Sequence, residues 1–99
     1  MRCVEFLSTE LRNALSKMGY RVHENKLKWG IELVVEGKNN ITTVGIYNSS
    51  DDTDKVTIEI SGLSNPTDYT VDIVDCRCLN GRIYDCIDEI LATLKSFHR

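Results

Sequence analysis

The sequence lacks any long apolar run, because no more than three strictly apolar residues follow one another, as at 33–35 and 90–92. A membrane-spanning helix needs about 20 such residues. Near the start of the chain, Glu5 interrupts the segment that would have to form the apolar centre of a secretory signal. We therefore expect a soluble, cytoplasmic protein with no export signal and no membrane partner.

The chain also lacks an excess of positive charge. It carries 12 Lys and Arg against 15 Asp and Glu, for a formal net charge of -3. Nucleic-acid-binding domains need clustered Lys and Arg to neutralise phosphates, so we expect no direct nucleic-acid binding. The six glycines are scattered and form no phosphate-cradling loop. No nucleotide or other cofactor is expected.

Histidine is scarce, which weakens the case for an enzyme. Only His23 and His98 are present. Nucleophilic catalysis needs a histidine beside an activated Ser or Cys and an orienting acid, and no spacing in the chain brings such groups together. We assign no catalytic residue from these side chains.

The four cysteines do not follow a metal or redox spacing. They are Cys3, Cys76, Cys78 and Cys86, with no Cys-x-x-Cys pair among them. Structural zinc sites generally use two pairs whose members are two to four residues apart, so no metal is expected. Because cytosolic thiols stay reduced, a cytoplasmic location predicts four free thiols.

What the chain does have is a clear change of apolar period. Its 99 residues, 41% of them apolar, suit a single domain spanning 1–99. Apolar residues recur every three or four positions over 4–18 and again over 83–97, which predicts two amphipathic helices. Gly19 is placed to end the first helix, and Asn80 is placed to cap the second.

Between the two helices the apolar period is two, which predicts strands. We expect strands at 27–35, 41–48, 55–61 and 69–74, turns at 36–40, 48–54 and 62–68, and an uncertain extra strand at 20–23. These elements predict an α+β two-layer sandwich. An antiparallel meander of four to five strands would be covered on one face by both helices, and its other face would be open.

The open face is the candidate site. Four apolar residues fall on the non-core side of their expected strands: Val34, Ile41, Tyr47 and Val74. Cys76 and Cys78 follow the same alternation further along the chain. Contiguous exposed apolar patches mark interaction surfaces. We therefore expect a non-catalytic module that binds a protein partner, or a second copy of itself as a dimer, through this face.

Negative charge is concentrated in the second half of the chain. Residues 1–48 carry seven Lys or Arg and five Asp or Glu, whereas residues 49–99 carry five and ten. Asp51, Asp52 and Asp54 lie in one predicted loop and would attract a basic partner surface. A narrower hypothesis follows, namely an acidic inhibitor that blocks a nucleic-acid-handling enzyme.

An enzymatic alternative uses two strand carboxylates. Glu32 and Glu59 follow the helix in an order similar to that of magnesium nucleases of the restriction-endonuclease type. Such sites carry a lysine two residues after the second acid, but here that position holds Ser61. We therefore favour binding over catalysis.

Overall fold

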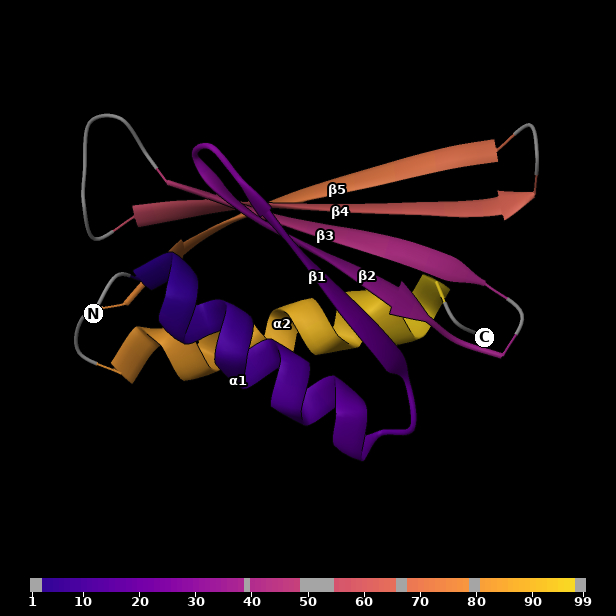
Figure 1. Ribbon diagram of the computed structural model, residues 1–99, viewed down its shortest axis with the longest axis horizontal. Coiled ribbons are helices and arrows are strands. Elements are labelled where there is room, and N and C mark those ends of the chain that lie inside the picture. Colours follow the sequence, from indigo (N-terminus) through magenta and orange to yellow (C-terminus); the bar gives the residue numbers. More distant parts are fainter. Residues whose placement is uncertain (1–2, 39, 49–54, 66–67, 79–80, 98–99) are drawn as a thin grey trace.

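The computed structural model describes residues 3–38, 40–48, 55–65, 68–78 and 81–97, with side chains described except at 63–65, 68–74 and 97. Two helices flank five strands in the chain (Figure 1). The helices are α1 (Cys3–Lys17) and α2 (Arg82–Phe97). The strands are β1 (Arg21–Leu27), β2 (Gly30–Glu36), β3 (Ile41–Asn48), β4 (Lys55–Asn65) and β5 (Asp68–Arg77).

The strands form one antiparallel meander in the order β1-β2-β3-β4-β5. Both helices lie on the same side of this sheet, below it in Figure 1. The α+β two-layer sandwich expected from the sequence is thus confirmed, and the extra strand at 20–23 is real, because these residues lead into and begin β1. No helix within the described ranges is long and apolar enough to cross a membrane.

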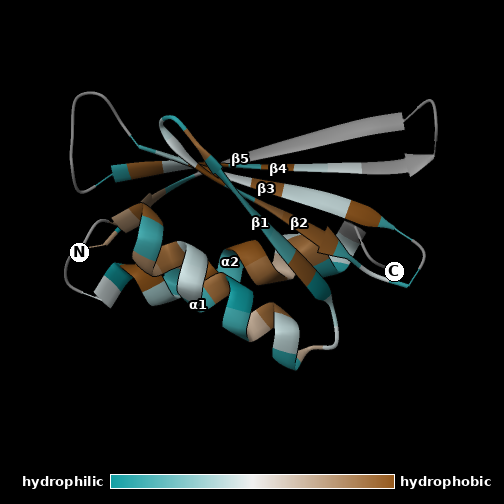
Figure 2. Cartoon of the chain, viewed as in Figure 1, coloured by the Kyte–Doolittle hydropathy of each residue, from teal (hydrophilic) through white to brown (hydrophobic). Residues whose placement is uncertain are grey.

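The core lies between the helices and the covered face of the sheet. In Figure 2, apolar residues, coloured brown, recur along both helices and along the strands of the sheet. Leu7, Leu11 and Leu15 of α1 are fully buried, as are Ile90 and Leu94 of α2. The alternating residues predicted to face the core from β2, β3 and β4 are buried as well: Ile31, Leu33, Val35, Thr42, Val44, Ile46, Val56, Ile58 and Ile60.

A glycine cap ends α1 as predicted. Gly19 has a φ of 94°, in the left-handed region that glycine adopts without strain. The amide of Tyr20 donates to the carbonyl of Leu15 at 3.1 Å, and the amide of Gly19 donates to that of Ser16 at 3.1 Å. This is the Schellman pattern, which satisfies the last helical carbonyls and turns the chain into β1.

The strand expected at 27–35 is in fact interrupted by a hairpin turn. Leu27 ends β1 and pairs with Gly30, which begins β2, while Lys28 and Trp29 form the two-residue turn. Trp29 is 62% exposed rather than inward-facing. The prediction of one continuous strand is wrong because the alternation of apolar residues continues through the turn, and the turn lacks the Asn-Gly or Asp-Gly signature of tight hairpins.

The cysteines of the β5 region lie on the opposite face from the one expected. Cys76 pairs with Val56, and the two side chains are 1% and 0% exposed on the helix side of the sheet. Cys78 packs against the same core. The alternation expected for β5 is therefore wrong by one residue, a shift that exchanges the faces of a strand. An irregularity between β4 and β5 at Leu63/Asn65 is part of this register.

The prediction of four free thiols is also wrong. Cys3 is bonded to Cys78 and Cys76 to Cys86, with Cα–Cα distances of 5.7 and 5.8 Å, which lie within the range of protein disulfides. The expectation rested on compartment alone. The fold supplies the missing information, because it brings α1, β5 and α2 together at the one place where all four cysteines lie.

Candidate functional site

The side of the sheet that carries no helix is the candidate site, and we call it the open face. Cross-strand pairing and the buried residues of the covered side define its membership. Its described residues are Arg21, His23, Asn25, Leu27, Gly30, Glu32, Val34, Glu36, Ile41, Thr43, Gly45, Tyr47, Lys55, Thr57, Glu59, Ser61, Asp75 and Arg77.

Three of the four predicted apolar residues lie on the open face. Ile41 is 55% exposed, and Val34 and Tyr47 are half-buried. Val34 and Ile41 are neighbours, because Val34 pairs with Thr43, two residues along β3 from Ile41. Tyr47 lies towards the other end of β3, where it pairs with Gly30. The structure therefore gathers two of these residues and sets the third apart.

Tyr47 lies along β3 with its hydroxyl end over Gly45. A Cβ atom at Gly45 would meet Oη, Cζ and Cε2 of the tyrosine. Side chains two residues apart in a strand share a face, so the missing Cβ leaves room for the ring. Apolar alternation alone does not reveal this arrangement, although the Gly-x-Tyr spacing in a predicted strand is a signal for it.

Two carboxylates flank this tyrosine. Gly45 pairs with Glu32 of β2 on one side and with Glu59 of β4 on the other. Strands lie about 4.8 Å apart, so the backbones of the two glutamates are separated by about 10 Å. Asn25 Nδ2 donates to Glu32 Oε1 at 3.4 Å. The arrangement presents an aromatic ring between two negatively charged carboxylates, which can pair with cations.

The same two glutamates are those of the nuclease hypothesis. The structure places both on the open face, separated by one strand. Among the residues that it describes, no group of three or more His, Cys, Asp or Glu side chains is placed to hold a metal ion. Cleavage stays a prediction that only an activity assay tests.

Positive charge on the open face lies at its ends. Arg21 pairs across strands with Glu36 at one end, and Lys55 pairs with Arg77 at the other. Lys55 Nζ lies 3.6 Å from Asp75 Oδ2, and the other carboxylate oxygen, Asp75 Oδ1, accepts a hydrogen bond from Thr57 Oγ1 at 3.2 Å. The centre of the face, around Gly45, is thus more acidic than its ends.

The remaining predicted site residues fall outside what the structure describes. Asp51, Asp52 and Asp54 lie outside the described residues. The backbone of Val74 pairs with that of Ile58, a buried residue of the covered side, so this position of β5 does not lie on the open face as expected; the side chain itself lies outside the described part of the chain. The roles of the three aspartates stay predictions.

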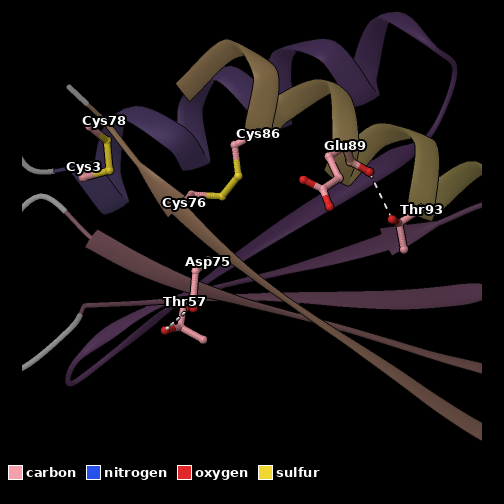
Figure 3. Close-up of a disulfide and its surroundings, with 8 residues drawn as sticks. All are labelled: Cys3, Thr57, Asp75, Cys76, Cys78, Cys86, Glu89 and Thr93. Atoms are coloured by element: carbon pink, nitrogen blue, oxygen red, sulfur yellow. Dashed lines mark hydrogen bonds between the residues drawn. A yellow bond between two sulfur atoms is a disulfide. The ribbon is translucent and has the colours of Figure 1, made fainter. Parts of the chain in front are cut away.

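A second unusual feature lies on the helix side. The two disulfides join the C-terminal end of β5 to both helices, and we call this group, Cys3–Cys78 with Cys76–Cys86, the cysteine clamp. Figure 3 shows the clamp on one side of the sheet and the Thr57–Asp75 pair on the other. The open face and the clamp are therefore separate features.

Comparison of the chain with protein-family models, curated proteins and solved structures finds no match in any of the three. No known family therefore supplies roles for the residues of the open face or the cysteine clamp. Their roles follow from geometry and chemistry alone.

Proposed function

We propose that this chain is a non-catalytic interaction module that binds a protein with a basic surface through the open face. One observation carries the proposal: both helices that the structure describes lie on the other side of the sheet, although Ile41 is 55% exposed on this side and Val34 and Tyr47 are half-buried there. An antiparallel sheet with one solvated face usually presents polar side chains on that face. Apolar side chains among them favour a docking role.

The chemistry of the partner follows from the centre of the face. Arginine can stack its planar guanidinium on an aromatic ring while it pairs with carboxylates. Tyr47, between the strands that carry Glu32 and Glu59, offers both kinds of contact. The neighbouring Val34 and Ile41 can pack against the aliphatic stems of Lys or Arg.

The compartment is part of the proposal. A cytoplasmic location predicts reduced thiols. The two disulfides contradict that prediction and favour a compartment that is oxidising enough to keep them. A basic protein partner in such a compartment is therefore preferred over an intracellular nucleic-acid enzyme.

The test exchanges charge on the open face. The double variant Ile41→Lys with Glu59→Lys is compared with a control pair outside the sheet, Met18→Lys just after α1 and Asp88→Lys in α2, which makes the same change in charge and also replaces one exposed apolar residue and one acid. Proteins captured from the native host by the wild type should be lost with the first variant, kept with the control and released by salt.

Two results would contradict the proposal. One is capture of the same proteins by the open-face variant and the wild type. The other is a concentration-dependent doubling of mass in light scattering that the open-face variant abolishes, because it would make a second copy the occupant of the face. Circular dichroism of both variants verifies that each remains folded.

A further inference from the structure

One disulfide of the cysteine clamp borders an open cavity. Cys76 and Cys86 line a space of about 310 Å³ between the ends of β4 and β5 and the helix α2. The two cysteines are otherwise nearly buried, at 1% and 7% exposure. The cavity thus brings solvent and small molecules up to a bond that the fold encloses on its other sides.

The lining of this cavity is rich in charge. Lys55, Arg77 and Arg82 contribute three positive charges, against Asp75 and Glu89. Lys55 and Asp75 lie 3.6 Å apart and offset each other, so Arg77 and Arg82 against Glu89 give the described lining an excess of one positive charge, which favours anions. Cations beside a cysteine stabilise its thiolate, which makes it a better leaving group in thiol–disulfide exchange.

We propose that the Cys76–Cys86 disulfide is a site of reversible S-thiolation by a low-molecular-weight thiol that carries negative charge. The incoming thiolate donates an electron pair to Sγ of Cys86 and forms a new S–S bond, while the bond to Cys76 breaks. Cys76 leaves as a thiolate, and the proton of the incoming thiol goes to solvent. One disulfide replaces another, so the step consumes no oxidant.

Exposure and charge select the sulfur that is attacked. Cys86 is 7% exposed and Cys76 is 1% exposed, so the nucleophile reaches Cys86 more readily. Arg77 follows Cys76 in the chain and lines the same cavity, as does Lys55. These cations lie near Cys76 and can stabilise its thiolate when it leaves. The mixed disulfide is therefore expected on α2 and the freed thiolate on β5.

Opening this bond detaches α2 from β5 while Cys3–Cys78 still joins α1 to β5. The modified protein is thus expected to keep its fold. The disulfide itself lies on the helix side of the sheet (Figure 3), although Lys55, Asp75 and Arg77 of the cavity lining also belong to one end of the open face. The inference uses no contact with the proposed protein partner.

The test treats the oxidised full chain with two thiols of the same carbon skeleton, 2-mercaptoethanesulfonate and 2-mercaptoethanol. Freed cysteines are blocked with N-ethylmaleimide, and the adducts are located by peptide mass spectrometry. The sulfonate should modify Cys86 roughly threefold to tenfold faster than the neutral thiol, because the cationic lining raises the local concentration of anions. High salt should remove the difference.

Arg82→Gln should abolish the preference for the sulfonate, whereas Lys95→Gln, a matched change outside the cavity lining in the last turn of α2, should leave it unchanged. Three results would each overturn the proposal: equal rates for the two thiols in the wild type, adducts on Cys3, Cys76 or Cys78 in place of Cys86, or four cysteines that are already free in the purified protein. Circular dichroism of the adduct checks that the fold persists.

Discussion

The two edges of the sheet are tied to the helices by different chemistry. At the β5 edge, each helix is joined to the strand by a disulfide. At the β1 edge, α1 is joined by polar contacts to one carboxylate: Ser8 Oγ donates to Glu24 Oε1 at 2.9 Å, and Arg12 lies 3.7 Å from the same oxygen. The attachment of the β5 edge is therefore sensitive to reductants, and that of the β1 edge is sensitive to changes in the charges around Glu24.

The difference shows two ways of protecting an edge strand. Glu24 points towards the helices with its side chain only 23% exposed, and a charge directed inwards from an edge strand opposes pairing with another chain. At the end of β5, the buried Cys76 and its bond to α2 hold the strand under the helix layer. Covalent attachment is expected to contribute more to stability than the polar contacts.

The largest effect is expected from the disulfide that closes the longer loop of the chain. Cys3→Ser with Cys78→Ser removes a bond between residues 75 apart. By the chain-entropy account, such a long closed loop stabilises the fold by about 4 kcal/mol. Urea unfolding of the oxidised variant and wild type measures this loss. A loss below that of the Cys76/Cys86 pair would contradict the expected order.

The second disulfide should matter less for stability. Cys76→Ser with Cys86→Ser removes a bond between residues only 10 apart, and the same account predicts a loss of about 3 kcal/mol. Adding a reductant to this variant should then remove the contribution of Cys3–Cys78 as well. If the reductant has no further effect on the urea midpoint, only one of the two bonds supports the fold.

The fold was largely predictable because its periodicities are regular. The stripes of α1 and α2 and the alternation in β2, β3 and β4 mark one buried face each, and most of their described residues are buried, although Met18 at the end of the first stripe is 38% exposed. Prediction failed where local signals were weak. The turn at Lys28 and Trp29 lacks turn residues, and the register of β5 depends on pairing with β4, which no local pattern specifies.

The site was predictable only in part for a related reason. Alternation alone places Val34, Ile41 and Tyr47 on the open face, because each shares a strand with residues of the core. The position of Tyr47 over Gly45 follows from the Gly-x-Tyr spacing within one strand, whereas the proximity of the four cysteines depends on the packing of separate elements. The free-thiol prediction is wrong because it rests on the expected compartment of the protein, whereas disulfide formation also depends on how close the fold brings the cysteines.

At the β1 edge, Ser8→Ala should have the larger effect of the two polar contacts. Ser8 is 1% exposed, and its hydroxyl donates to a carboxylate of which little is exposed. Loss of a hydrogen bond to a charged group is expected to cost about 1.5 kcal/mol. Urea unfolding measures the cost, with the exposed Ser16→Ala as control. A loss no larger than that of the control would show that the Ser8–Glu24 bond contributes nothing.

The smallest effect is expected from Arg12→Gln. The Arg12 and Glu24 side chains are 42% and 23% exposed and lie 3.7 Å apart, so water screens their attraction. Partly exposed pairs of this kind contribute about 0.5 kcal/mol or less. Unfolding of Arg12→Gln at low and high salt measures the contribution, which should vanish at high salt. If Arg12→Gln costs more than Ser8→Ala, attraction between charges rather than the buried hydroxyl attaches α1 to β1. The β1 edge would then loosen with salt, while the disulfide-linked β5 edge would not.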